Sequence, residues 1–108
     1  MKIVRLHTTA PAANRDAVRD VLLNRTIVNC GIAAFEPGCC AHKGEKHFHE
    51  DDEVFIILNG EITVPITNGP TDIARAGDWV LVEAGEEHHL TNHTNIVCTA
   101  MYLIVRKP

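Results

Sequence analysis

Short apolar segments separated by turn residues fill the second half of this chain. The run at 54–58, Val-Phe-Ile-Ile-Leu, leads directly into Asn59-Gly60, a dipeptide typical of a tight β-hairpin turn. Further turn residues follow at 68–70, 76–78 and 84–85. Turns that recur about every 8 to 12 residues are typical of an all-β sandwich or barrel, and a jelly-roll architecture fits them.

The same pattern extends over most of the chain, and we expect its 108 residues, 1–108, to form one domain. The segment 16–23 is ambiguous, because its apolar residues would share one face of a helix, whereas Val21-Leu22-Leu23 could begin a strand. We favour a short helix or a loop there. The predicted strands are 2–6, 26–35, 54–58, 61–66, 73–75, 79–82, 87–91 and 96–105.

The stretch from His47 to Glu53 carries the strongest chemical signal. On a β-strand, residues two apart point to the same face, so His47 and His49 can direct their imidazoles at one point. Glu53 has the same parity and follows a short acidic run, so a small bend could bring its carboxylate there. His88 could supply a third nitrogen. Three imidazoles and one carboxylate suit a divalent transition metal.

The residues around this stretch occur at a distinctive spacing. His47-x-His49 is followed after three residues by Glu53 and after six more by Gly60. This spacing resembles the first signature motif of the cupin family, G-x5-H-x-H-x3,4-E-x6-G. The leading glycine of that motif falls on Ala41 in this chain. It is not a ligand position in the family, so the departure leaves the implied metal site intact.

A second group of residues resembles the other cupin motif, G-x5-P-x-G-x2-H-x3-N. Gly77, Gly85, His88 and Asn92 occupy the matching positions, and Glu83 stands where the family usually has proline. The geometry of the turn at Glu83 is therefore less well defined by the resemblance. Together the two motifs span about residues 38–92.

The resemblance implies a cupin jelly roll, also described as a double-stranded β-helix, with one metal held by His47, His49, Glu53 and His88. These donor types allow Fe, Mn, Ni, Cu, Co or Zn. A site with three nitrogens and one oxygen leaves coordination positions for a substrate, for water or for oxygen. Catalytic residues beyond the metal centre, and any organic cofactor, are not indicated.

Two functions follow from such a site, a third possibility involves no metal, and the sequence leaves all three open. We favour a metal-dependent enzyme that acts on a small polar metabolite, as a dioxygenase or by enolisation of the isomerase or lyase type. The alternative is a non-catalytic module that binds or senses a small molecule or a metal, which suits a short chain without an obvious second acid or base. The third is a metal-free barrel in which the histidines are only packed.

Composition excludes other classes of function. The net charge is −4 and the basic residues are scattered, so we do not expect nucleic acid as a partner. No segment has the roughly 20 apolar residues needed to cross a membrane, and the first residues lack the apolar core of a signal peptide. We expect a cytoplasmic protein. The four cysteines show no disulfide or zinc-finger spacing, and Cys30 and Cys98 are predicted to be small buried residues.

Both faces of two strands are apolar, which indicates that both are covered. One face of 54–58 and of 96–105 would fill the barrel, while the other needs a partner surface. We infer a homodimer that packs sheet on sheet, with an N-terminal segment over the outer face as the alternative.

Several single side chains also carry expectations. Glu50, Asp51 and Asp52 are expected to form a solvated acidic turn. Glu83 is either an exposed loop carboxylate or a charged group near the barrel opening, with the first favoured. Either Met101 or Tyr102, whichever faces inward, is a candidate wall of the pocket.

Overall fold

The computed structural model describes residues 1–5, 19, 21–39, 50–86 and 89–108. Within these residues the regular structure is almost entirely β-strand. The strands are β1 (Lys2–Arg5), β2 (Thr26–Phe35), β3 (Asp52–Asn59), β4 (Glu61–Pro65), β5 (Thr71–Arg75), β6 (Asp78–Val82) and β7 (Cys98–Arg106).

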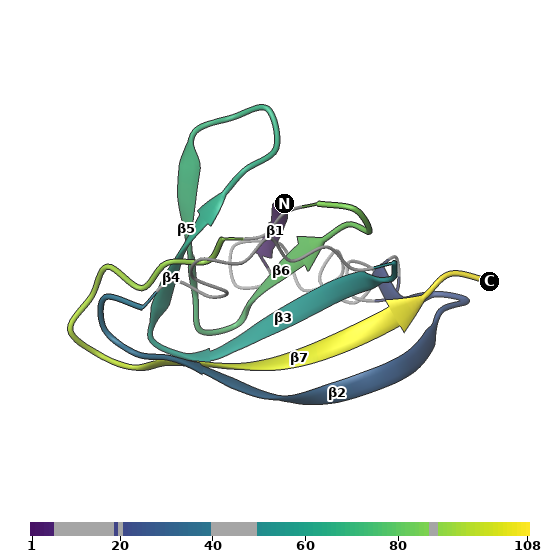
Figure 1. Ribbon diagram of the computed structural model, residues 1–108, viewed down its shortest axis with the longest axis horizontal. Helices are drawn as coiled ribbons and strands as arrows, with labels where there is room; N and C mark the ends of the chain where they lie inside the picture. The colour runs from purple at the N-terminus through teal and green to yellow at the C-terminus, as the bar shows by residue number, and fades with distance from the viewer. Residues whose placement is uncertain (6–18, 20, 40–49, 87–88) are drawn as a thin grey trace.

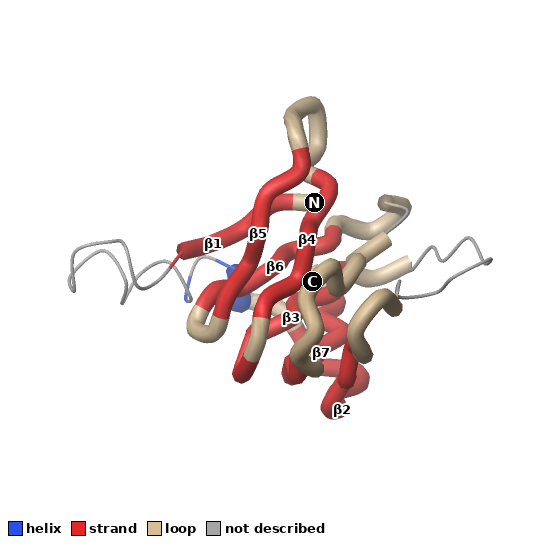
Figure 2. Tube along the Cα trace, turned by 90° about the vertical axis from the view of Figure 1, so that its left-hand side faces the viewer, coloured by secondary structure: helices blue, strands red, loops and turns tan. Residues whose placement is uncertain are grey.

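Five of the strands form one antiparallel sheet in the order β1-β6-β3-β7-β2, and β4 and β5 pair as a separate hairpin. Figure 1 shows β3, β7 and β2 as long neighbouring strands, with the hairpin standing away from them at one end. The hairpin forms a second layer against the larger sheet, as the view from the side shows (Figure 2). This two-layer arrangement places a core between the sheets.

The inner face of the large sheet, the face that packs against the β4–β5 hairpin, carries the main core. Alternate residues of each strand point to this face, because side chains in a strand alternate between its two sides. One row runs through Ile3, Val80, Phe55, Tyr102 and Gly31, which lie opposite one another on successive strands. The hairpin contributes the buried side chains Ile62, Val64 and Ala74 to the same cluster.

The outer face of the sheet is partly covered by the N-terminal part of the chain. Val21 and Leu22, which are helical, pack with Val4 against a buried cluster of Val54, Trp79, Leu81 and Val105. The amide of Leu23 donates to the carbonyl of Arg19 at 2.7 Å, the pairing of an α-helical turn. Of the segment 16–23, for which a short helix or a loop was expected, the described residues 19, 21 and 22 are helical, and the N-terminal covering expected as the alternative is observed over part of this face.

Gly60 directly follows β3 and has a backbone conformation and surroundings that require glycine. Its φ is +82°, and an added Cβ would lie 2.9 Å from the carbonyl oxygen of Val97 and 3.0 Å from the Cα of Cys98. The Asn59-Gly60 turn predicted from the sequence is thus also a point of close packing against the start of β7.

Some local expectations are wrong. Cys98 is buried as predicted, but Cys30 is exposed, because β2 is the edge strand of the sheet. The segment predicted as a strand at 87–91 has its described residues outside the named strands, apart from a bridge between Thr91 and Thr63. β7 begins at Cys98, two residues later than expected.

Candidate metal centre

Glu53 is the predicted metal ligand that lies within the described residues. It is the second residue of β3, lies opposite Val82 on β6 and Ile104 on β7, and shares the parity of the inward-facing Phe55. Its side chain is only 6% exposed. The structure thus places this carboxylate on the inner face of the large sheet.

Burial shifts the ionisation of this carboxyl group. It raises the pKa of Glu53 from 4.5 to about 7, because a charged carboxylate loses water on entering a less polar environment. Its ionised form is therefore costly in the protein alone. A divalent cation beside it would offset that cost, since an adjacent opposite charge favours the ionised form.

The surroundings of Glu53 become more exposed to solvent towards β2, the edge strand of the sheet. Beside Ile104, the edge strand β2 presents the exposed Asn29, and Tyr102 and Ile104 are half-buried. Tyr102 packs against the inner core, whereas Met101 is 38% exposed on the outer face. Of the two candidates left open by the sequence, Tyr102 is therefore the one that can form a wall of this region.

The three histidines predicted as ligands, His47, His49 and His88, lie outside the described residues. Within the described part of the chain, no three His, Cys, Asp or Glu side chains gather in a way that could hold a metal. The donor set nevertheless suits a divalent transition metal, because imidazole nitrogen and carboxylate oxygen are both ligands for these ions. Glu53, buried on the inner face with a raised pKa, fits the role of the oxygen donor.

Asp52 corrects the expectation of a solvated acidic turn at 50–52. Its side chain is buried, although Glu50 is exposed and Asp51 half-buried. The carboxylate of Asp52 binds the guanidinium of Arg25 and accepts a hydrogen bond from the amide of Ala84 at 2.7 Å. This residue therefore connects β3 to the turn that follows β6.

That turn spans residues 83–86 and contains the position where the second motif departs from the family. Glu83 is exposed and its carboxylate lies 3.5 Å from the ammonium of Lys2, as expected for a loop carboxylate. Burial raises the pKa of Glu86, but hydrogen bonds from the Glu83 amide and the Thr67 hydroxyl, with the nearby Met1 ammonium, outweigh it and leave the pKa below its usual value.

Asn92, the last residue of the second motif, organises the loop before β7. It is fully buried, and its Nδ2 donates to the carbonyl oxygens of Phe35 and Ile96, each at 2.8 Å. Its Oδ1 accepts hydrogen bonds from the amide and the hydroxyl of Thr94. The backbone of Asn92 also pairs with residues 38 and 39, so this residue ties the region before the first motif to the end of the second.

Two surface cavities flank the turn at 83–86. One, of about 220 Å³, is lined by Met1, Lys2, Ile66, Thr67, Leu81, Glu83 and Glu86. The other, of about 240 Å³, is lined by Glu50, Asp51, Asp52, Ala84, Arg106 and Lys107. Among the described residues, neither lining includes Glu53.

Comparison with known families gives a clear assignment. The Cupin domain family matches residues 31–105, which is more than half of the chain. The chain therefore belongs to the cupin family. The predicted fold class, an all-β double-stranded β-helix, is confirmed by this match and by the solved structures that resemble it.

Solved structures share the fold at low sequence identity. A predicted oxalate decarboxylase from Thermotoga maritima is 24% identical, with 85% of this chain and 73% of that chain covered and a TM-score of 0.61. An RmlC-like cupin from Methanocaldococcus jannaschii is 18% identical, with coverage of 73% and 68% and a TM-score of 0.58. A structure of Drosophila melanogaster CENP-C bound to CAL1 is 17% identical, with coverage of 71% and 64% and a TM-score of 0.59.

Comparison with curated proteins gives no match. Among the described residues, no helix has the length and apolar character needed to span a membrane.

Proposed function

We propose that this cupin binds one divalent transition metal through His47, His49, Glu53 and His88. The observation that carries the proposal is the burial of the Glu53 carboxylate on the inner face, with a pKa raised to about 7. A buried acid of this kind is found where a positive charge or a chemical role compensates its burial. The three histidines, which occur at the spacing of the two family motifs, would provide the remaining donors.

The metal centre would serve an enzyme that acts on a small polar metabolite, either as a dioxygenase or by isomerase- or lyase-type enolisation. When bound, such a metal acts as a Lewis acid towards substrate oxygen atoms, and iron or copper also supports oxygen chemistry. The half-buried Tyr102 and Ile104 beside Glu53 would form the wall against which the substrate lies. Their mainly apolar surface would exclude water from one side of the substrate.

A binding or sensing module is the second candidate, and one observation favours it. The residues opposite Glu53 on the two neighbouring strands, Val82 and Ile104, are both apolar. The same fold also occurs in the structure of CENP-C bound to CAL1, which is a complex between proteins. A cupin barrel can therefore be used for binding as well as for catalysis.

The metal content of the purified protein tests the proposal. Protein prepared without a histidine tag or chelator should contain about one equivalent of transition metal per chain, measured by elemental mass spectrometry. His49→Ala and Glu53→Gln should lose it, whereas His93→Ala, at an exposed histidine outside the motifs, should retain it. A wild-type protein that takes up no metal on reconstitution near about pH 7.5 would contradict the metal centre.

The same variants separate an enzyme from a module. Turnover of a small carbonyl or catechol-like compound that disappears in His49→Ala would establish the enzyme. Tight binding of a metabolite without turnover would establish the module.

We also infer that the protein forms a homodimer through the part of the outer face that the N-terminal residues leave open. Ile32 and Met101 lie opposite each other and Met101 lies opposite Ile56, so one apolar row crosses β2, β7 and β3. Ile32 is 60% exposed and Met101 is 38% exposed. β2 carries no charged residue, which is unusual for an exposed edge strand.

A second copy is the occupant that this surface suits best. Two copies related by a two-fold axis bring the same apolar row into contact with itself. Because the row contains no charged side chain, such a contact creates no repulsion between like charges.

A further inference from the structure

The turn at 83–86 connects β6 to the segment that contains His88. The amide of Glu86 donates to the carbonyl of Glu83 at 3.0 Å, and Gly85, the third residue of the turn, has a φ of +85°. Both features are typical of a type II β-turn. His88 follows Glu86 by two residues, so its Cα can lie at most about 7 Å from that of Glu86. The position of the turn therefore limits where His88 can lie.

Carboxylates bind two successive amides of this turn. The amide of Glu83 donates to Oε2 of Glu86 at 3.0 Å, and the amide of Ala84 donates to Oδ1 of Asp52 at 2.7 Å. A hydrogen bond to an ionised acceptor is shorter and stronger than one between neutral groups. The turn is thus held from two sides by charged acceptors.

Asp52 joins the turn to the strand that carries the predicted ligand Glu53. Its carboxylate is buried, binds the guanidinium of Arg25, and lies 3.7 Å from the ammonium of Lys107. These contacts hold its side chain in one orientation. Because Asp52 directly precedes Glu53 in β3, it connects the two ligand-bearing segments through one side chain.

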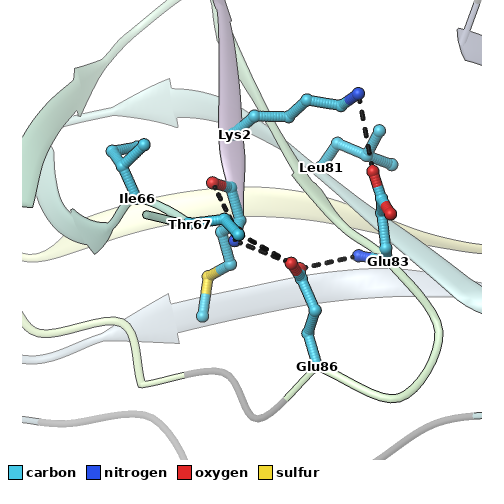
Figure 3. A pocket seen from close by; sticks show the side chains of 7 residues that line it. Lys2, Ile66, Thr67, Leu81, Glu83 and Glu86 are labelled. Atoms are coloured by element: carbon cyan, nitrogen blue, oxygen red, sulfur yellow. Dashed lines mark hydrogen bonds and ion pairs between the residues drawn. The ribbon is translucent and has the colours of Figure 1, made fainter. Parts of the chain in front are cut away.

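Glu86 joins the same turn to the loop after β4. Its Oε1 accepts a hydrogen bond from the hydroxyl of Thr67 at 2.8 Å and lies 3.1 Å from the ammonium of Met1. Figure 3 shows these groups converging on the carboxylate, with the Glu83 amide on its other oxygen. The contacts of Glu86 therefore reach beyond its own turn.

Glu83, which stands where the family usually has proline, explains why the Glu86 carboxylate matters in this chain. A proline at position 83 would fix φ near −65° and would have no amide hydrogen. Glu83 lacks that restriction on φ but has an N–H, and this N–H is bound by Glu86. The hydrogen bond restricts the turn where the proline ring would otherwise do so.

We propose that Asp52 and Glu86 are positioning residues of the metal centre, which fix the turn before His88 relative to the strand that carries Glu53. This inference rests on the metal centre proposed above. Removing residues that orient the metal ligands without binding the metal themselves typically lowers metal affinity by about 10- to 100-fold. We therefore expect Glu86→Ala to raise the Kd for a divalent metal by about tenfold.

A double-mutant cycle with Glu83→Pro tests the role of Glu86. Co²⁺ is titrated into metal-free wild type, Glu86→Ala, Glu83→Pro and the double variant, with affinity measured by calorimetry and geometry by visible absorption. In the Glu83→Pro background the ring restricts the turn and the bound amide is gone. There, Glu86→Ala should change the Kd by clearly less than in the wild type, because only the contacts of Glu86 with Thr67 and Met1 remain to be lost.

A matched control and a stability measurement separate positioning from folding. Glu61→Ala removes a glutamate whose side chain is 41% exposed and accepts a hydrogen bond from Arg75 at 3.3 Å, and it should leave the Kd and the Co²⁺ spectrum unchanged. All titrations are made well below the melting temperature of each variant. A Glu86→Ala protein with wild-type affinity, or with the same loss in both backgrounds, would overturn the role of Glu86.

Asp52 is tested by comparing two substitutions. Asp52→Asn keeps an oxygen that can accept from the Ala84 amide and should retain most of the affinity, whereas Asp52→Ala should lose about tenfold. Equal affinities in folded forms of both variants would overturn its role. If Asp52→Ala does not fold, the cycle at Glu86 still decides the inference. A wild type that binds no Co²⁺ would overturn the metal centre itself, a result distinct from loss in the variants alone.

Discussion

Glu53 is an acid in surroundings that favour its neutral form. In the metal-free protein its pKa of about 7 lies well above the ordinary value of 4.5, because the carboxylate is buried between strands. Between these two pH values the folded chain holds a proton that the unfolded chain has released. The free energy of unfolding must therefore decrease as pH rises through this range and level off above about pH 7.

We expect this pH dependence to disappear in Glu53→Gln. Urea unfolding of chelator-treated wild type and variant at about pH 5 and pH 8 measures it, since glutamine does not ionise. The wild type should lose up to about 3 kcal/mol relative to the variant over this interval. Parallel profiles for the two proteins would show that Glu53 does not carry the raised pKa.

At the scale of elements, local sequence predicted most of the strands but not which strands are neighbours in the sheet. The apolar run at 54–58 and the Asn59-Gly60 turn were read correctly because alternation and turn chemistry are local properties. Cys30 was expected to be buried and is exposed, because the order of strands in a sheet is not a local property. Of the predicted ligands, Glu53 lies on the inner face of the large sheet.

The roles of Asp52 and Asn92 also depend on contacts that the local sequence does not predict. Asp52 belongs to an acidic run that resembles a solvated turn, and its cationic partner Arg25 lies 27 residues earlier in the chain. Asn92 binds the carbonyl of Ile96 and so holds the loop that delays the start of β7. Pairings between distant residues, or between a side chain and a loop, leave no periodic pattern in the sequence.

Replacement of Asn92 should destabilise the loop before β7. Asn92→Ala removes two donated and two accepted hydrogen bonds at a fully buried position, and leaves the carbonyl of Phe35 without that donor. We expect a loss of about 2–4 kcal/mol in the free energy of unfolding. Asn95→Ala, at an exposed asparagine of the same loop, should cost less than about 0.5 kcal/mol, as measured by urea unfolding. Similar values for both variants would show that burial of Asn92 is not the cause.

At the scale of the whole molecule, the outer face is divided into two regions. Over β1, β6 and parts of β3 and β7, Val21 and Leu22 cover the sheet and complete a second core. Over β7 and β2, Ile32 and Met101 stay exposed. The N-terminal covering is therefore observed over one region of the outer face. The homodimer is proposed for the other region, which stays exposed.

A single charge in the exposed region should separate the two copies. Ile32→Glu places a carboxylate on a side chain that is 60% exposed, so folding should be preserved while association is weakened by burial of the charge. Light scattering coupled to size-exclusion chromatography should give a dimer for the wild type and a monomer for the variant. Thr71→Glu, on the exposed β4–β5 hairpin, should remain a dimer. A monomeric wild type at micromolar concentration would contradict the proposed interface.

The strand order also has a consequence for how the chain is made. β7 lies between β3 and β2, although it is synthesised after both of them. During translation, the backbone groups of β3 and β2 that will pair with β7 must wait until residues 98–106 have left the ribosome. Pairings between segments so distant in sequence form slowly, and unpaired strand edges favour aggregation. Truncation within residues 98–106 would therefore remove the strand that joins β2 to β3, and the nascent chain would be most vulnerable before these residues emerge.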